Sequence, residues 1–322
     1  MSAGTTAGPA ATESPSTGSD TEDQVTAGSP DESPTTATTT TATTTEVAPT
    51  TSDPSPIASI PPIASTPPAV KTPTPSTPLP VVAGTLPDIA GISGVNEPDC
   101  RSSHRPVVLL HGTLGSVAAS YGPLVTGLRA DDRCVYGLDY GSQGVGPVAD
   151  SARAFAQLVE AVRRRTGAPT VDVIGYSQGG LVLRTALRFD GLADRVRVAV
   201  LLAPSFHGTD SPLVAQVPSF LCPACRDQTT GSPLLRQLDT GGDLDGSVRY
   251  AVLSTRDDTV VTPVLAQPPR GPADRVDTLV VQDRCPAAMI GHVALPAEPG
   301  TIAWVLAALD TDGHPPANAY TC

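Results

Sequence analysis

The chain has 322 residues and a formal net charge of −12 at pH 7, but its composition changes near residue 98. Through residue 99 there are 11 acidic residues against the single Lys71, whereas residues 100–322 carry 21 acidic residues and 19 arginines. Residues 100–322 are therefore nearly neutral. They offer no basic face, which excludes nucleic acid as a partner, and no polybasic patch for a membrane surface. No run is long and apolar enough to span a bilayer.

Residues 1–97 form the first predicted part and are rich in Thr, Pro, Ser and Ala. This composition buries too little apolar surface to offset the entropy cost of ordering the chain, so we expect a disordered stalk or linker. Residues 98–322 form the second part, whose length suits a single α/β domain with one large core.

The second part alternates short apolar runs with amphipathic segments, a pattern typical of a mostly parallel central sheet with helices on both faces. In chain order, strands are expected over residues 107–110, 134–138, 171–174, 196–202, 248–253 and 276–281. Helices are expected over residues 121–128, 148–165, 181–189 and 302–309. The predicted class is therefore α/β.

One motif indicates nucleophilic chemistry. The segment Gly175-Tyr176-Ser177-Gln178-Gly179 follows the third predicted strand and precedes a helix, which is the context that a GxSxG nucleophile elbow requires. The glycines avoid collisions at a sharp turn, and the helix directs unpaired N–H groups at the place where an oxyanion forms. Ser177 is the candidate nucleophile, and an incidental serine in a Gly-rich turn is the disfavoured alternative.

A serine nucleophile needs a base within hydrogen-bond reach and an acid that orients the base, in the chain order serine, acid, histidine. His207 comes too early and His314 lies in a Pro-rich tail, which leaves His292 as the candidate base. Asp257 and Asp258 lie just beyond the strand at 248–253, and the residues alone allow either as the acid. The other carboxylate is expected to be solvated or bonded to local backbone.

The segment His111-Gly112-Thr113 follows the first strand, where the second element of an oxyanion hole belongs. The N–H groups of Thr113 and Gln178 would stabilise the developing negative charge. We expect His111 to brace this loop without transferring protons, and His207 to lie in a structural turn.

Six cysteines lie in the second part: Cys100, Cys134, Cys222, Cys225, Cys285 and Cys322. Their even number predicts three disulfides and an extracellular or cell-surface location. A zinc site at Cys222 and Cys225 is the disfavoured alternative, because a second ligand pair is missing. No other metal and no cofactor is implied. The first residues show no basic or apolar leader, so the signal peptide is expected to have been trimmed or to lie upstream.

With these residues placed, residues 100–322 resemble the secreted bacterial lipases and esterases of the α/β-hydrolase superfamily, and also Candida antarctica lipase B. The resemblance implies the α/β-hydrolase fold and the hydrolysis of carboxylic esters through an acyl-enzyme. It rests on these segments, in order: His111-Gly112-Thr113, Tyr176-Ser177-Gln178-Gly179-Gly180-Leu181, Leu202-Ala203-Pro204 with Gly208-Thr209, Asp258-Thr259-Val260-Val261-Thr262-Pro263, and Cys285 followed by Gly291-His292.

The resemblance also implies assignments that the residues alone leave open. Asp258 takes the acid position, and the hydroxyl of Thr113 can act as a further oxyanion donor. Tyr176 stands where the fungal enzyme has Trp, so the substrate pocket beside the nucleophile is expected to differ. The residues themselves argue against a large lid, because the segment 204–248 is short and rich in Pro and Gly, and this favours an accessible cleft and short or soluble esters as well as lipids. The implied disulfides join Cys100 to Cys134, Cys285 to Cys322 and Cys222 to Cys225.

The expected substrate is therefore an ester or a lipid. Two alternatives stay open, one of them a polyester or cell-envelope ester hydrolase or acyltransferase that uses the same triad. The other is an inert, wall-associated interaction module, against which the complete set of triad residues argues. The sequence does not indicate an oligomeric state.

Overall fold

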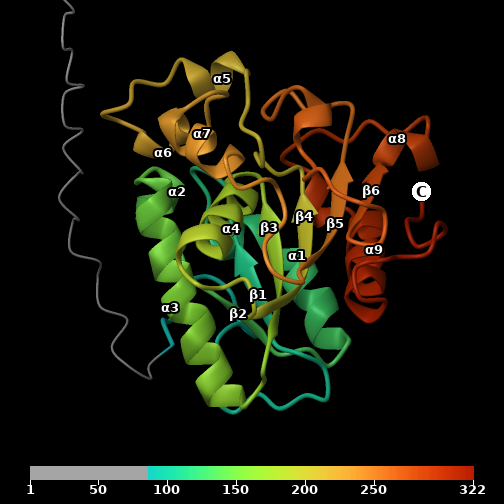
Figure 1. Ribbon diagram of the computed structural model, residues 1–322. Coiled ribbons are helices and arrows are strands. Elements are labelled where there is room, and N and C mark those ends of the chain that lie inside the picture. The colour runs from blue at the N-terminus through green and yellow to red at the C-terminus, as the bar shows by residue number, and fades with distance from the viewer. Residues whose placement is uncertain (1–85) are drawn as a thin grey trace, which may run out of the picture. The chain divides into compact units, whose positions relative to one another are not determined.

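A computed structural model describes residues 86–322, and most of the predicted stalk lies outside these residues. The described part is built on one sheet of parallel strands (Figure 1). The strands are β1 (Val107–Leu110), β2 (Val135–Gly137), β3 (Val171–Tyr176), β4 (Val196–Leu202), β5 (Arg249–Ser254) and β6 (Val276–Val280). Their spatial order is β2-β1-β3-β4-β5-β6. Most of them are buried on both faces, which explains why they read as continuous apolar runs.

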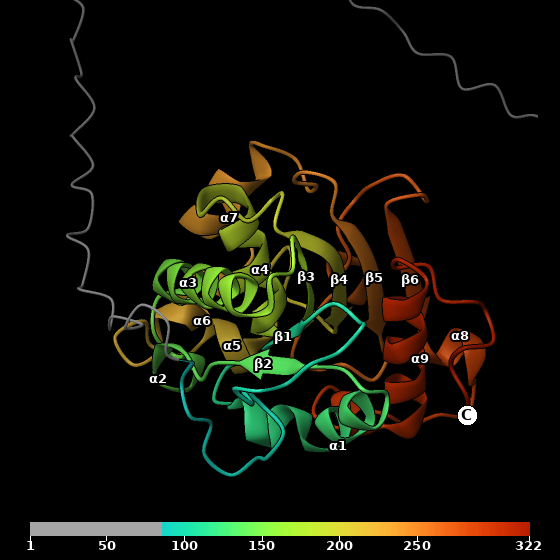
Figure 2. The same cartoon turned by 90° about the horizontal axis from the view of Figure 1, so that it is seen from below.

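Helices cover both faces of the sheet (Figure 2). On one face, α3 (Val148–Thr166) and α4 (Gln178–Phe189) pack against a core that includes Val108 and Leu110. On the other, α1 (Val117–Ala130) and α9 (Pro299–Asp310) pack against a core that includes Val107 and Leu109. Successive strand residues point to opposite faces, so β1 contributes to both cores. The predicted class and the two helical layers are confirmed.

The predicted strands agree with the structure to within about two residues, but the helices α1, α4 and α9 begin three or four residues earlier than predicted. Ser116 caps α1 by accepting a hydrogen bond from the backbone N–H of Ala119, so the helix includes residues before 121. Helix α4 begins at Gln178, directly after the candidate nucleophile.

Several short elements in the connecting segments were not predicted. They are α2 (Gly141–Gly144), α5 (Pro212–Ala215), α6 (Pro223–Gln228), α7 (Pro233–Asp239), α8 (Val281–Arg284) and the 3₁₀ turns η1 (Val264–Ala266) and η2 (Leu295–Ala297). Each is too short to show hydrophobic periodicity. Proline at the first helical position of α5, α6 and α7 is a signal that could have revealed them.

The packed part of the chain begins before residue 98. Ile89 and Val95 are buried, and Val95 forms a parallel bridge with Val135 at the edge of the sheet. The Asn96 amide donates to the carbonyl oxygens of Pro87 and Gly137 at 2.7 and 2.8 Å. The predicted boundary at residue 98 therefore lies after the first residues whose side chains belong to the core.

Three disulfides join Cys100 to Cys134, Cys222 to Cys225 and Cys285 to Cys322, so the cysteine pair at 222 and 225 is cross-linked rather than free to bind zinc. Two of them connect residues 34 and 37 positions apart, and the third connects residues 3 apart. In residues 86–322, no helix is long and apolar enough to cross a membrane.

Removal of the disulfides is expected to lower the melting temperature, because each cross-link restricts the unfolded chain. The chain-entropy estimate is about 4 kcal/mol for each long loop and about 2 kcal/mol for the short one. Circular dichroism melts of Cys285→Ser/Cys322→Ser should therefore show a larger loss than melts of the matched pair Cys222→Ser/Cys225→Ser. Equal melting temperatures for both pairs and the parent protein would contradict this expectation.

Candidate active site

The segment between β3 and α4 places Ser177 at a sharp turn. Its φ of 55° and ψ of −119° lie outside the regions that a residue with a side chain prefers. A Cβ atom on Gly179 would lie 2.2 Å from the carbonyl oxygen of Leu110, and one on Gly175 would lie 3.1 Å from the backbone of Gly179. The two motif glycines thus allow strand, turn and helix to approach closely enough to form the elbow.

Ser177, His292 and Asp258 come together in one hydrogen-bonded row. His292 Nε2 lies 3.0 Å from Ser177 Oγ, and His292 Nδ1 lies 2.8 Å from Asp258 Oδ2. All three side chains are buried. With the Nδ1 proton donated to the carboxylate, the Nε2 lone pair is left to accept the serine proton.

Asp258 is held by donors on both carboxylate oxygens. Oδ1 accepts from the backbone N–H groups of Val260 and Val261, each at 2.8 Å. Oδ2 accepts from Gln267 Nε2 at 2.9 Å as well as from His292. Gln267 directly follows η1, and its side chain is fully buried. It was not among the residues predicted from the sequence. Nothing in its local sequence distinguishes it from a surface glutamine.

Asp257 points to a different set of partners. Its Oδ2 accepts from the backbone N–H of Ile290 and from Gln282 Nε2, both at 3.1 Å. Gln282 also donates to Thr255 Oγ1 and accepts from the backbone N–H of Arg256. Asp257 is exposed to solvent, as one of the two expectations had it, but its carboxylate bonds to residues of distant segments and not to local backbone. Asp257 ties the loop after β5 to the loop that carries His292.

Tyr176 also contacts the histidine loop. Its hydroxyl donates to the carbonyl oxygen of His292 at 3.2 Å, and the two rings lie 5.0 Å apart between centroids. Burial raises the pKa of Tyr176, and the charge of Asp258 raises it further, so the hydroxyl stays protonated. A role for Tyr176 in the substrate pocket stays a prediction.

The loop after β1 brings Thr113 beside Gln178. Gln178 Nε2 donates to Thr113 Oγ1 at 3.0 Å, and Gln228 Nε2 of α6 donates to the same oxygen at 2.9 Å. Gln178 is the first residue of α4, where a backbone N–H has no acceptor within the helix. Gln228 is a second residue that the sequence analysis missed.

His111 holds the loop after β1 in place. Its ring stacks on Tyr140 with 4.0 Å between centroids and an interplanar angle of 10°. Nδ1 lies 2.8 Å from the carbonyl oxygen of Gly112, and Nε2 accepts from the backbone N–H of Tyr140. Burial lowers the pKa of His111, which favours this neutral form. The contacts give His111 a bracing role.

His207 lies in a turn that connects three segments. Its Nδ1 faces the carbonyl oxygen of Ala266 and its Nε2 faces Asp243 Oδ2, each at 2.9 Å. Burial opposes ionisation of Asp243, but the hydrogen bonds from His207 and the backbone of Arg270 lower its pKa to about 2. Buried Arg184 of α4 donates to the same carboxylate. This cluster anchors α4 and the turn that precedes Gln267.

Most of the exposed large hydrophobic side chains lie in segments that follow the carboxyl ends of the strands. Of the eight large hydrophobic side chains exposed in residues 86–322, seven follow the carboxyl ends of strands, where α5, α6 and α8 also lie (Figure 1). We call these seven the apolar rim: Leu114, Leu213, Phe220, Leu221, Leu265, Met289 and Val293. Leu114 and Val293 are the direct neighbours of Thr113 and His292. The seven residues therefore belong to connecting segments at the same end of the sheet as the candidate site.

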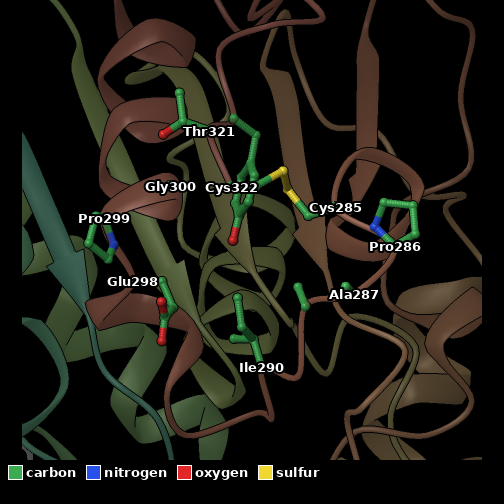
Figure 3. A pocket seen from close by; sticks show the side chains of 11 residues that line it. Cys285, Pro286, Ala287, Ile290, Glu298, Pro299, Gly300, Thr321 and Cys322 are labelled. Carbon is green, nitrogen blue, oxygen red and sulfur yellow. A yellow bond between two sulfur atoms is a disulfide. The ribbon is translucent and has the colours of Figure 1, made fainter.

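A separate cavity of about 550 Å³ lies beside the Cys285–Cys322 disulfide (Figure 3). Ile290, Glu298 and Tyr320 are among its lining residues. None of the triad side chains lines it. Its link to the site is the loop that carries both Ile290 and His292.

Comparison with known proteins agrees with this architecture. Residues 105–221, which include Ser177, match a protein family described as alpha/beta hydrolase fold. No curated protein sequence matches the chain.

Among solved structures, Aspergillus fumigatus lipase B is similar, with a TM-score of 0.61 and 21% identity over 67% of this chain and 55% of that one. The chain thus spans about half the length of that lipase. A Bacillus subtilis carboxylesterase matches with a TM-score of 0.42 and 17% identity over 66% of this chain and 86% of that one. The family match and the parallel sheet show that this chain has the α/β-hydrolase fold.

Proposed function

We propose that the protein hydrolyses carboxylic esters through Ser177, His292 and Asp258. The observation that carries the proposal is the buried row of hydrogen bonds from Ser177 Oγ to His292 Nε2 at 3.0 Å and from His292 Nδ1 to Asp258 at 2.8 Å. An elbow serine with a base and an orienting acid in this arrangement is suited to acyl transfer.

In the proposed reaction, Ser177 Oγ attacks the ester carbonyl carbon while His292 Nε2 takes the serine proton. The carbonyl electron pair moves onto its oxygen, and the N–H groups of Thr113 and Gln178 stabilise this oxyanion. The intermediate expels the alcohol, which receives the proton from His292, and an acyl-serine remains. Water then attacks the acyl carbon and gives a proton to His292. The acid leaves as that proton returns to Ser177 Oγ.

The apolar rim supports a narrower proposal about the substrate. Exposed apolar patches of this kind mark surfaces that bind apolar partners. Here the seven exposed residues follow the strand ends that carry the triad, and we propose that together they form such a patch, which favours water-insoluble esters, such as lipids or polyesters, over small soluble esters as the natural substrates. The acyltransferase alternative uses the same covalent intermediate. The inert-module alternative is disfavoured because the three triad side chains retain their mutual hydrogen bonds.

The proposed setting of the reaction is outside the cell. Three disulfides in residues 86–322 support an oxidising compartment.

Ser177→Ala should abolish ester hydrolysis without unfolding the protein, because the hydroxyl is the nucleophile and contributes little packing. The expected loss of kcat is on the order of 10⁶, the scale seen when a subtilisin triad member is removed. Turnover of p-nitrophenyl butyrate measures this loss, with a circular dichroism melt as the folding control. A folded variant with near-normal turnover would contradict the assignment of the nucleophile.

The two adjacent aspartates give a sharper test. Every partner of the Asp258 carboxylate is a hydrogen-bond donor, so an amide in Asp258→Asn must turn its NH₂ group toward either His292 or the backbone N–H groups. An NH₂ group that faces His292 would favour the wrong tautomer of the imidazole. We therefore expect Asp258→Asn to lower kcat strongly, by about 10⁴ as in the serine-protease example.

Asp257→Asn is the matched control and should cost little kcat. Both partners of Asp257 share one oxygen, which the asparagine carbonyl can replace. Initial rates of ester hydrolysis, with melts as the folding control, show which of the two aspartates is the acid. A larger loss of kcat in Asp257→Asn than in Asp258→Asn would assign the acid role to Asp257.

Polar substitution in the apolar rim should impair attack on insoluble esters selectively. Phe220→Ser/Leu265→Ser removes two exposed side chains, each worth roughly 1.5–3 kcal/mol when buried against an apolar surface. Turnover of an emulsified triglyceride should fall by about ten-fold or more, with p-nitrophenyl acetate turnover unchanged. Phe189→Ser is the control, because Phe189 is exposed at the far end of α4. Equal effects of both changes on the emulsion would contradict a role for the rim.

A further inference from the structure

The hydroxyl of Thr113 has an unusual set of partners. Its oxygen accepts hydrogen bonds from two side-chain amides, Gln178 Nε2 at 3.0 Å and Gln228 Nε2 at 2.9 Å. A hydroxyl group has two lone pairs and one proton to donate. Both lone pairs are therefore engaged, and in residues 86–322 no acceptor contacts the hydroxyl proton.

Neighbouring carbonyl groups determine the orientation of both amides. The NH₂ group of Gln178 also donates to the carbonyl oxygen of Gly144 at 2.7 Å. The NH₂ group of Gln228 also donates to the carbonyl oxygen of Ala224 at 3.2 Å, while its Oε1 accepts from Ser205 Oγ at 3.0 Å. A flipped amide would place two carbonyl oxygens against each other. Both NH₂ groups must therefore face Thr113.

We propose that Gln228 is a positioning residue of the oxyanion hole. Together with Gln178 it occupies the acceptor sites of the Thr113 hydroxyl, so the hydroxyl proton is directed to the ester oxygen as that oxygen becomes negative. This inference rests on the ester hydrolysis proposed above. It adds a contribution from α6, a helix that carries none of the triad residues.

The surroundings of Gln228 fit this role. The side chain is 2% exposed at the end of α6, whose turn is closed by the Cys222–Cys225 disulfide. Backbone hydrogen bonds from Ala224 to Val145 and from Thr209 to Gln228 hold the helix against the site. A buried amide is costly unless each polar atom has a partner, and here its NH₂ and its oxygen both have one.

The physical consequence is a donor aligned before the reaction begins. A free hydroxyl rotates among several orientations and can turn its proton toward any nearby acceptor. With both lone pairs engaged, the orientation that remains is the donating one, and no reorganisation is needed as charge develops. A donor of this kind acts on the transition state and not on the bound ester, so its loss lowers kcat and leaves KM nearly unchanged.

The test compares four variants of the full chain on p-nitrophenyl butyrate. Thr113→Val removes the hydroxyl with little change in shape. Gln228→Leu removes the amide, and Gln228→Glu replaces a donor by a carboxylate that accepts the Thr113 proton. Arg226→Gln is the control, because Arg226 is exposed on the same helix and the substitution changes the net charge by the same amount as Gln228→Glu.

Thr113→Val should lower kcat by about 10², the scale for the loss of one oxyanion donor. Gln228→Glu should approach that loss, Gln228→Leu should lose less, and Arg226→Gln should match the parent protein. The ratio of kcat for Gln228→Glu to kcat for the parent should fall as the pH rises from about 5 to about 9, because only the ionised carboxylate captures the Thr113 proton.

A double-mutant cycle separates positioning from a structural role. In the Thr113→Val background, Gln228→Glu and Gln228→Leu should cause no further loss of kcat, because the hydroxyl on which they act is absent. Parent-like kcat for Thr113→Val, or undiminished losses in the Thr113→Val background, would overturn the inference. If Gln228→Glu does not fold, the cycle with Gln228→Leu gives the same decision. Failure of the proposed function would instead appear as parent turnover that does not depend on Ser177.

Discussion

The hydrogen bond between Ser177 Oγ and His292 Nε2 depends on a strained turn, and the rest of the candidate site is arranged around that turn. A residue with a φ of 55° and ψ of −119° costs of order 1–3 kcal/mol, which the surrounding structure must offset. Close packing of Gly179 on Leu110 and the insertion of β3 between β1 and β4 hold the turn in place. The turn lifts the serine hydroxyl out of the sheet, within 3.0 Å of the base.

The acid and the base come from separate loops, so their alignment depends on contacts between those loops. Asp257 reaches from the acid loop to the backbone of Ile290, and Tyr176 reaches from the nucleophile strand to the carbonyl of His292. Gln267 adds a donor to the carboxylate oxygen that also faces His292. The contacts of Tyr176 and Gln267 are buried, where hydrogen bonds are strong and unpaired groups are costly, whereas the contact of Asp257 lies at the surface. The loops therefore have one well-satisfied arrangement.

The segment between β4 and β5 has a larger part in this arrangement than its composition indicated. It was expected to be a short connection without a large lid, and its helices are indeed short. It nevertheless supplies Gln228 to Thr113, His207 to the cluster around Asp243, and exposed Phe220 to the apolar rim. Local sequence could not show the roles of Gln228 and His207, because their partners Thr113 and Ala266 lie in segments distant in the chain.

The sequence by itself determined the α/β class, the strand positions and the candidate residues Ser177 and His292, because hydrophobic periodicity and the elbow motif are local properties. It left Asp257 and Asp258 equivalent until a family resemblance favoured one of them. Only the tertiary structure decided the partners of those two carboxylates, together with the contacts of Gln267 and Gln228. The physical reason is that a side-chain hydrogen bond depends on the position and direction of two atoms, which the folded backbone sets and which no local pattern encodes.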